Sequence, residues 1–228
     1  MLERDLVSVI IPAYNAARYL GEAIRSVLAQ TPFSIQLVVV DDGSTDETTR
    51  VAQSFGETVH SLYQPNGGIA SALNLGLTHT RGEWLAFCAA DDMWTEGRLE
   101  KQFAVFSTSP APDIVFGHVQ NFFSPELGPE ITERYHCPPE PLPGYSLASM
   151  LIRRETFDRV GGFDEKFRIG EFVDWYARAK HLGLSSQLVP NVVLRRRLHG
   201  TNLSIRAAND RRDFARILRA AMERRRAK

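Results

Sequence analysis

The sequence predicts a single α/β domain of the Rossmann-like kind, in which helices flank a mostly parallel central sheet and a further helix follows at the C-terminal end. Three observations lead to this prediction. Short apolar runs occur at 7–11, 35–40 and 85–90, and the first two are rich in β-branched residues, as is typical of strands covered on both faces. Apolar residues at helical spacing fill the segments between them. Strands and helices alternate along the chain at the spacing typical of right-handed strand–helix–strand units with parallel strands.

The elements of the first half, 1–94, follow this alternation. The first strand stops at Pro12, and the next helical face consists of Leu20, Ala23, Ile24, Val27 and Leu28. After the second strand, Ser44 and Glu47 have the spacing of a capping box, which predicts a helix start. A weaker strand is expected at 58–63. The helical face that follows it consists of Ile69, Ala72, Leu73 and Gly76.

The second half is less regular. Helices are expected at 95–107, at 171–182 and at 154–160, where Gly161 and Gly162 stop the last of these. Strands are expected at 113–123, 145–152 and 192–198. The segment 124–144 is rich in proline and charge, which predicts a long loop. From Asn209 onward, apolar residues at helical spacing lie among seven arginines, which predicts a basic helix.

The composition excludes several classes of protein. The 228 residues include 27 basic and 27 acidic side chains, so no net charge favours nucleic acid or an anionic membrane. Cys88 and Cys137 form neither a metal-ligand pattern nor a disulfide framework. No signal peptide is recognisable, and no apolar run approaches the ~20 residues that span a bilayer. We therefore expect a soluble, cytoplasmic protein; the sequence gives no indication of its oligomeric state.

Two strands end in paired carboxylates, Asp41-Asp42 and Asp91-Asp92. Ligands of parallel sheets bind outside the carboxyl ends of the strands, so these pairs are expected at one edge. Isolated charge is unfavourable to bury, and a divalent cation that holds a phosphorylated ligand would neutralise it. For either pair alone, capping of the following turn is an equally good interpretation. The two pairs together favour a nucleotide-type site.

Glu171 and Asp174 lie one helical turn apart on the polar face of the expected helix at 171–182. Two nearby carboxylates repel, which raises the pKa of at least one of them toward the range of a general base. The plainer interpretation is a solvated face on which Asp174 pairs with Arg178. The opposite face is an apolar stripe of Phe172, Trp175, Tyr176 and Ala179.

His199 ends a strand that contains Arg195, Arg196 and Arg197. From this position an imidazole nitrogen could reach a metal at the site, and such a ligand suits manganese-like ions. Side chains alternate along a strand, so only part of the arginines can face a diphosphate. For the basic tail we expect a helix packed on the domain, with membrane-surface docking as the alternative. The tail has too few aromatic residues for stacking on nucleic acid.

Several motifs resemble glycosyltransferase family 2. They are Val7-Ser8-Val9-Ile10-Ile11-Pro12-Ala13-Tyr14-Asn15, Val40-Asp41-Asp42-Gly43-Ser44-Thr45-Asp46, Asn66-Gly67-Gly68, Ala72-Leu73-Asn74-Leu75-Gly76 and Ala90-Asp91-Asp92-Met93-Trp94. The resemblance extends to about 205 and implies the A-type glycosyltransferase fold, with a nucleotide-binding half at 1–94 and an acceptor-side half at 95–205. The basic helix would occupy 206–228.

The resemblance implies an inverting transferase that moves a sugar from a nucleotide-diphospho-sugar, by family habit a UDP-sugar, with Mn²⁺ or Mg²⁺ as cofactor. It implies that Asp41 bonds the base, that Gly43 lets the backbone approach the nucleotide, and that Asp91 and His199 hold the metal. The matched donor-binding positions are Pro12, Ala13, Asn15, Asp41, Ser44, Asn74, Ala90 and Asp91. The acceptor stays open among saccharide, lipid and peptide.

Three positions depart from the family pattern. Ala89 stands where an aspartate usually precedes the metal ligand, Leu73 replaces an arginine, and Phe172 replaces the aspartate that serves as base. The base is therefore expected to be Asp174, which is slightly favoured, or Glu171. The departures also motivate a second hypothesis, a non-catalytic nucleotide-sugar-binding or scaffold protein. We do not expect a dinucleotide oxidoreductase, because the sequence contains no Gly-x-Gly-x-x-Gly turn.

Overall fold

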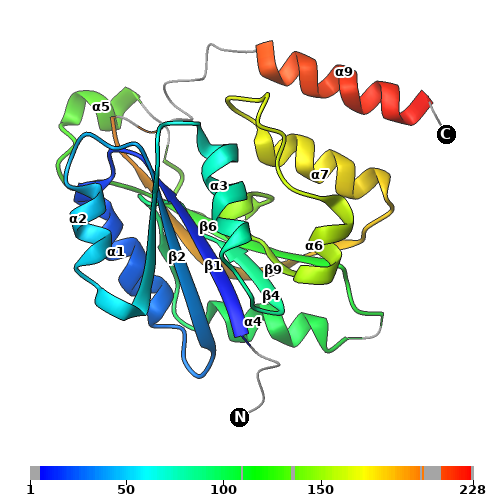
Figure 1. The fold of residues 1–228 in the computed structure, drawn as a ribbon, viewed down its shortest axis with the longest axis horizontal. Coiled ribbons are helices and arrows are strands. Elements are labelled where there is room, and N and C mark those ends of the chain that lie inside the picture. Colours follow the sequence, from blue (N-terminus) through cyan, green and yellow to red (C-terminus); the bar gives the residue numbers. More distant parts are fainter. Residues whose placement is uncertain (1–5, 109, 135–136, 201, 203–211, 227–228) are drawn as a thin grey trace.

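A computed structural model describes residues 6–108, 110–134, 137–200, 202 and 212–226. Within them a nine-stranded sheet has the strand order β3-β2-β1-β4-β8-β6-β9-β5, and β7 pairs with β6 beside this path (Figure 1). The strands are β1 (Leu6–Ala13), β2 (Ser34–Asp42), β3 (Val59–Gln64), β4 (Trp84–Phe87), β5 (Met93–Trp94), β6 (Ile114–Phe123), β7 (Leu142–Gly144), β8 (Leu151–Arg153) and β9 (Ser186–Leu198).

Six of the nine strands in the described part of the chain run in the same direction. β1 is parallel to β2 and β4, and β2 is parallel to β3. β8 is antiparallel to both β4 and β6, so β6 points the same way as β4, and β9 is the parallel neighbour of β6. The carboxyl ends of β1, β2, β4 and β9 therefore lie at one edge, where ligands of such sheets bind.

Helices cover both faces of the sheet. α1 (Ala17–Leu28), α2 (Thr48–Gln53) and α4 (Arg98–Phe106) pack on one face, and α3 (Ile69–Thr78), α6 (Arg154–Val160) and α7 (Glu171–His181) pack on the other. Alternation along β1 produces the two cores, because Val9 and Ile11 join the first and Ile10 joins the second. The predicted α/β class with a mostly parallel sheet is confirmed.

The C-terminal helix is also present. α9 (Arg212–Arg226) packs against α7 at the periphery of the molecule (Figure 1). The predicted start of this helix at Asn209 and the domain boundary at 205/206 lie outside the described residues. Across the part of the chain that the structure describes, we find no helix with the length and apolar character to cross a bilayer.

Several local predictions need correction. Ser44 and Glu47 form no capping box: α2 starts at Thr48, whose backbone amide donates to Oδ1 of Asp46. The expected loop 124–144 contains a short helix, α5 (Pro129–Arg134), and the strand β7. In 145–152, a 3-10 turn (Leu147–Ser149) precedes β8, because Oγ of Ser149 bonds the carbonyls of its own turn. β9 begins six residues earlier than the expected 192, at Ser186.

Gly117 of β6 offers a test of the packing behind the site. A methyl group at this position would lie 2.4 Å from Cγ1 of Val193, a fully buried residue of β9. We expect Gly117→Ala to lower the free energy of unfolding by about 1–3 kcal/mol, since overpacking forces the neighbours apart. Urea unfolding measures this loss. Gly128→Ala, where a methyl group meets nothing within 4 Å, is the matched control and should be neutral; equal midpoints for both variants would contradict the packing described here.

Candidate active site

A carboxylate, an imidazole and an amide meet at the carboxyl ends of β4 and β9. Asp91 lies in the turn after β4, and His199 directly follows β9. Nε2 of His199 is 2.9 Å from Oδ2 of Asp91, and Nδ2 of Asn202 donates to the same oxygen at 3.0 Å. The Asp91 side chain is 27% exposed and that of His199 is 9% exposed. The structure thus brings the two predicted metal ligands together and leaves the Asp91 carboxylate open to solvent.

This donor set fits a divalent cation. Carboxylate oxygen and imidazole nitrogen together suit manganese-like ions, and two protein ligands leave the other coordination positions to water and phosphate oxygens. Among the described residues no group of three or more His, Cys, Asp and Glu side chains forms a further candidate. Ala90, predicted at the donor site, is buried in the turn that positions Asp91.

A buried arginine of β9 contacts the turn that carries Asp91. Arg197, 4% exposed, lies between the rings of Tyr19 and Phe122, with its Cζ atom 4.8 Å from each ring centroid. Its Nη2 donates to Oε2 of Glu22 at 2.6 Å, and its Nε donates to the backbone carbonyl of Asp91 at 3.1 Å. A guanidinium that makes hydrogen bonds and ring contacts on several sides is held in one position. Arg197 therefore orients the Asp91 turn instead of reaching outward to a diphosphate.

Asp92 is the buried partner of Asp91. Burial, and secondly the neighbouring Asp91 carboxylate, raise the pKa of Asp92 to about 8. Oδ1 of Asp92 accepts a hydrogen bond from the backbone amide of Arg197 at 2.9 Å, which joins the β4 turn to β9. The backbone bond from Arg197 opposes this rise in the pKa of Asp92, and burial outweighs it.

The loops after β1 and β2 are joined by side chains of Asn15 and Ser44. Oγ of Ser44 accepts a hydrogen bond from the backbone amide of Asn15 at 2.8 Å, and Oδ1 of Asn15 accepts one from the backbone amide of Thr45 at 2.8 Å. Asn15 adopts φ 49°, a left-handed conformation that asparagine tolerates. Pro12 and Ala13 end β1 directly before this junction. These predicted donor-binding residues thus lie next to one another at the edge of the sheet, with Ala13 buried.

Asp41 is placed differently from the prediction. Its side chain is fully buried: Oδ1 accepts from the Ser44 amide at 2.9 Å, and Oδ2 accepts from the Thr49 hydroxyl. Asp41 therefore holds the 41–49 turn in shape, and both of its carboxylate oxygens are hydrogen-bonded within the chain. Contact of Asp41 with the base stays a prediction that this geometry does not support.

Gly43 allows a close approach between two loops. It has φ 76°, and a methyl group there would lie 2.6 Å from the backbone nitrogen of Asn66. The neighbouring Asp42 accepts from the amides of Gly67 at 2.7 Å and Gly68 at 2.9 Å. The glycine at 43 thus allows contact with the 66–68 loop. Approach of its backbone to a nucleotide stays a prediction.

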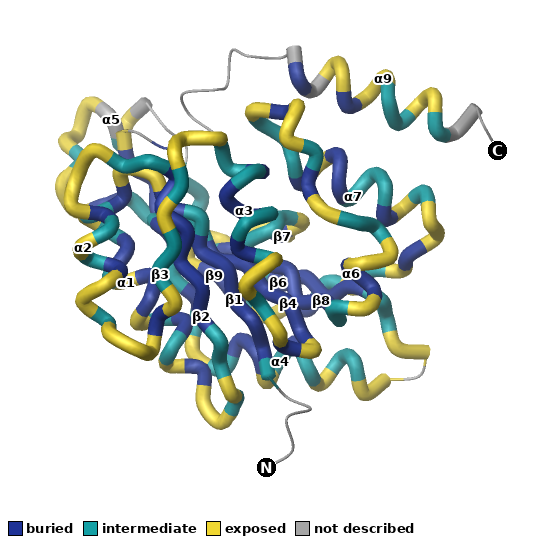
Figure 2. Tube along the Cα trace, viewed as in Figure 1, coloured by how far each residue is buried: buried dark blue, intermediate teal, exposed yellow. Residues whose placement is uncertain are grey.

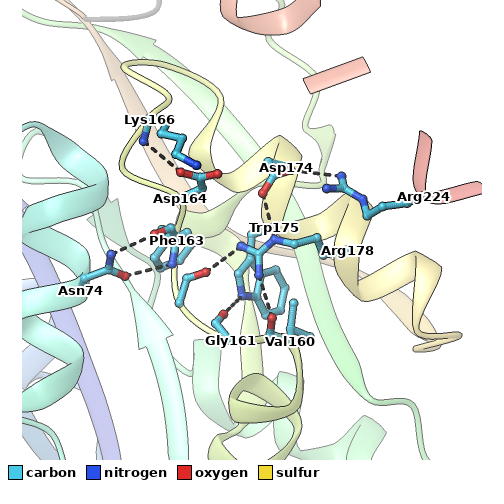
Figure 3. A network of polar contacts seen from close by, with 11 residues as sticks. Asn74, Val160, Gly161, Phe163, Asp164, Lys166, Asp174, Trp175, Arg178 and Arg224 are labelled. Carbon is cyan, nitrogen blue, oxygen red and sulfur yellow. Dashed lines mark hydrogen bonds and ion pairs between the residues drawn. The ribbon is translucent and has the colours of Figure 1, made fainter. Parts of the chain in front are cut away.

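Asn74 of α3 binds protein backbone. Its Nδ2 donates to the Phe163 carbonyl at 2.9 Å, and its Oδ1 accepts from the Phe163 amide at 2.9 Å (Figure 3). Nδ2 also donates to Oε1 of Glu165 at 2.9 Å. The side-chain amide of Asn74 thereby holds the loop that leads into α7. A role of Asn74 in donor binding stays a prediction that this geometry does not support.

Asp174 is not placed to serve as a base. Its side chain is 3% exposed, Oδ2 accepts from Nε of Arg178 at 2.9 Å, and Oδ1 accepts from Nη2 of Arg224 at 3.1 Å (Figure 3). Arg178 also donates to the backbone carbonyls of Val160 at 2.7 Å and Gly162 at 2.6 Å. This network ties α6, α7 and α9 together. Asp174 as the slightly favoured base stays a prediction that this geometry does not support.

Glu171 is the remaining carboxylate of this helix. It begins α7 after Gly170, which adopts φ 81°, and its side chain is half-buried. Burial raises the pKa of Glu171, although the nearby backbone amides of 170–172 oppose the shift. Phe172 packs in the core against Trp175 and Tyr176. Of the two predicted candidates, Glu171 is the less buried, since Asp174 is 2% exposed.

The comparisons with known proteins agree with this fold. The model of the family described as Glycosyl transferase family 2 matches residues 8–164, from β1 through the Asp91 turn into the loop between α6 and α7. The chain belongs to glycosyltransferase family 2. The predicted family, and with it the transferase class 2.4, is confirmed.

Relatives within glycosyltransferase family 2 include an uncharacterized glycosyltransferase of Rickettsia typhi, which is 31% identical over 92% of this chain and 69% of its own length. Another, from Nostoc sp., is 34% identical over 89% of this chain and 68% of its own length.

Solved structures share the fold of this chain. S. aureus TarS 1–349 in complex with UDP-GlcNAc has a TM-score of 0.74 at 19% identity, over 96% of this chain and 66% of that one. Mannosyltransferase PcManGT from Pyrobaculum calidifontis, in complex with GDP-Man and Mn²⁺, has a TM-score of 0.69 at 20% identity, over 93% of this chain and 64% of that one. The chain thus spans about two thirds of the length of these solved proteins.

Sequence reasoning missed the residues that support the Asp91–His199 pair. Alternation along the strand predicts that Arg197 faces opposite to Arg196, but not that Arg197 bonds the Asp91 carbonyl and Glu22. Asn202 stands three residues after His199, and its Oδ1 accepts from the His199 amide at 2.6 Å. Such spacing is typical of an asparagine that closes a turn, which is the signal that could have identified it.

Proposed function

We propose that this chain is an inverting, metal-dependent glycosyltransferase that moves a sugar from a nucleotide-diphospho-sugar to an acceptor. The observation that carries the proposal is the meeting of Asp91 and His199 at the same sheet edge as the Asn15–Ser44 junction. A nucleotide along this edge would place its nucleoside at the junction and its diphosphate near Asp91. Family membership supplies the reaction class.

On the donor side, Asp91 and His199 would hold Mn²⁺ or Mg²⁺. When bound there, such an ion would supply positive charge that stabilises the leaving diphosphate. Arg197 and Asn202 hold the two ligands in place through the bonds described above, so the ligand geometry exists before the donor binds. The combination of imidazole and carboxylate favours Mn²⁺, the ion named in the PcManGT complex.

On the acceptor side, we propose Glu171 as the general base. Inversion requires that the acceptor attack the anomeric carbon from the side opposite the leaving diphosphate, and the base must take the proton there. Glu171 is half-buried with a raised pKa, as suits a carboxylate that accepts a proton near neutral pH. This assignment replaces the aspartate of the family pattern, whose position is Phe172.

A donor panel tests the proposal. UDP-sugars are the proposed donors, with support from the UDP-GlcNAc complex of TarS, and GDP-mannose is the comparison because of PcManGT. With Mn²⁺ present we expect release of UDP from at least one UDP-sugar by hydrolysis or transfer. Mass spectrometry of acceptor mixtures of saccharides, lipids and peptides would identify the acceptor. No turnover of any donor would contradict the proposal.

The second candidate is a non-catalytic nucleotide-sugar-binding protein. Ala89 and Phe172, two departures from the family pattern at functional positions, favour it. Calorimetry separates the candidates, because the scaffold would bind a nucleotide sugar with Mn²⁺ and release no nucleotide over prolonged incubation. The proposed transferase would bind and turn over the same donor.

A further inference from the structure

α9 has two unlike faces. On the inner face Ile217 is 3% exposed and Asp213 is 8% exposed, whereas on the outer face Leu218 is 62% exposed and Met222 is 49% exposed. Leu218 and Met222 lie four positions apart, and Ala215, also exposed, precedes Leu218 by three. Residues at this spacing share one side of a helix. An apolar strip of Ala215, Leu218 and Met222 therefore points away from the domain.

Polar contacts hold this orientation. Oδ2 of Asp213 accepts from the Arg168 amide at 2.9 Å near one end of α9, and Arg224 pairs with the buried Asp174 at 3.1 Å near the other. Figure 2 shows α9 as an outlying helix beside α7, with exposed positions along its outer side. These contacts fix the orientation of the apolar strip relative to the rest of the domain.

The charge of α9 sets it apart from the rest of the chain. Its fifteen residues contain six arginines against Asp213 and Glu223, a net charge of +4, while the whole chain is neutral. Arg219 is exposed beside the apolar strip, and Arg216, whose side chain is 70% exposed, also pairs with Asp213 at 3.3 Å. Lys180 of α7 adds a further exposed positive charge beside Leu218 and Met222, with which it lines a shallow hollow.

We propose that the outer face of α9 docks on an anionic membrane surface. The arginines would bind lipid phosphates, and Leu218 and Met222 would enter the interface between headgroups and acyl chains. A convex helix at the edge of a protein can lie flat on a bilayer without a complementary groove. Two apolar side chains are a weak anchor, so the proposed binding depends on anionic lipid. This inference does not depend on the proposed transferase activity.

Vesicle flotation of the full chain tests this proposal. Vesicles of phosphatidylcholine alone are compared with vesicles that contain phosphatidylglycerol in addition, at low and high salt. We expect the protein to float with the anionic vesicles at low salt and to be released by high salt, because screening weakens attraction to the surface. Equal recovery with both vesicle types, or no binding to either, would overturn the proposal.

Two double variants locate the binding surface. Leu218→Ser/Met222→Ser and Arg216→Gln/Arg219→Gln should each lower partitioning by about tenfold or more. All four side chains are exposed, so thermal melting should stay unchanged. Arg50→Gln/Arg81→Gln removes two exposed charges elsewhere and should bind like the wild type. If the α9 variants also bind like the wild type, the assignment is wrong. If they instead disrupt a dimer, the face binds a second copy and the proposal is overturned.

Discussion

Replacing Glu171 by glutamine is expected to lower kcat for transfer by about 10²–10⁴-fold while donor affinity stays unchanged, because the amide keeps the shape of the side chain and cannot accept the acceptor's proton. In the wild type, kcat should fall as the pH drops through the pKa of Glu171, which burial raises above the ordinary range of a glutamate. Steady-state kinetics from about pH 4 to about pH 9, a range that spans the ordinary pKa of a glutamate side chain, measure the loss of kcat and its dependence on pH. The acidic limb of the profile should be lost in Glu171→Gln.

Asp174→Asn is the matched control for Glu171→Gln. Asp174 is paired with Arg178 and Arg224 and is almost wholly buried, so the amide should destabilise the fold by about 3–5 kcal/mol. Below its melting temperature the folded fraction should still transfer sugar. Abolished turnover in a folded Asp174→Asn protein, with turnover retained in Glu171→Gln, would reverse the two assignments.

Asp91→Asn is expected to remove the stimulation of transfer by Mn²⁺ and to lower kcat/KM by about 10²–10³-fold, which corresponds to about 3–4 kcal/mol of transition-state stabilisation. An amide oxygen is a weaker ligand than a carboxylate, although it can keep the bond from Asn202. Donor turnover against Mn²⁺ concentration measures the loss. Asp158→Asn, at an exposed position of α6, is the control and should behave like the wild type. A variant at Asp91 with unaltered metal dependence would show that the metal binds elsewhere.

The order and class of most elements could be predicted because they depend on local patterns. The fully buried runs of β1, β2 and β4 and the apolar face of α1 are visible in the sequence without any tertiary information. Convergence of Asp91 and His199 followed from one rule, that parallel strands end at a common edge. The rule needed only the direction of β9, which pairing with β6 confirms.

The predicted site roles that the geometry does not support fail for one physical reason. Asp41, Asn74 and Asp174 are polar residues whose partners come from segments distant in the sequence or from backbone groups. A sequence shows that a carboxylate or amide is present, but burial and hydrogen bonding decide whether it faces a ligand or another part of the chain. The pairing of Asp174 with Arg178 was visible as an i, i+4 spacing; the second partner, Arg224 of α9, was not.

Binding of UDP in the presence and absence of Mn²⁺, measured by titration calorimetry, tests most directly the claim that Asp91 and His199 form a metal-assisted diphosphate site. We predict that Mn²⁺ tightens UDP binding in the wild type by tenfold or more, about 1.4 kcal/mol, and that this gain disappears in Asp91→Asn and in His199→Ala. The same Kd with and without Mn²⁺ in the wild type would contradict the central claim.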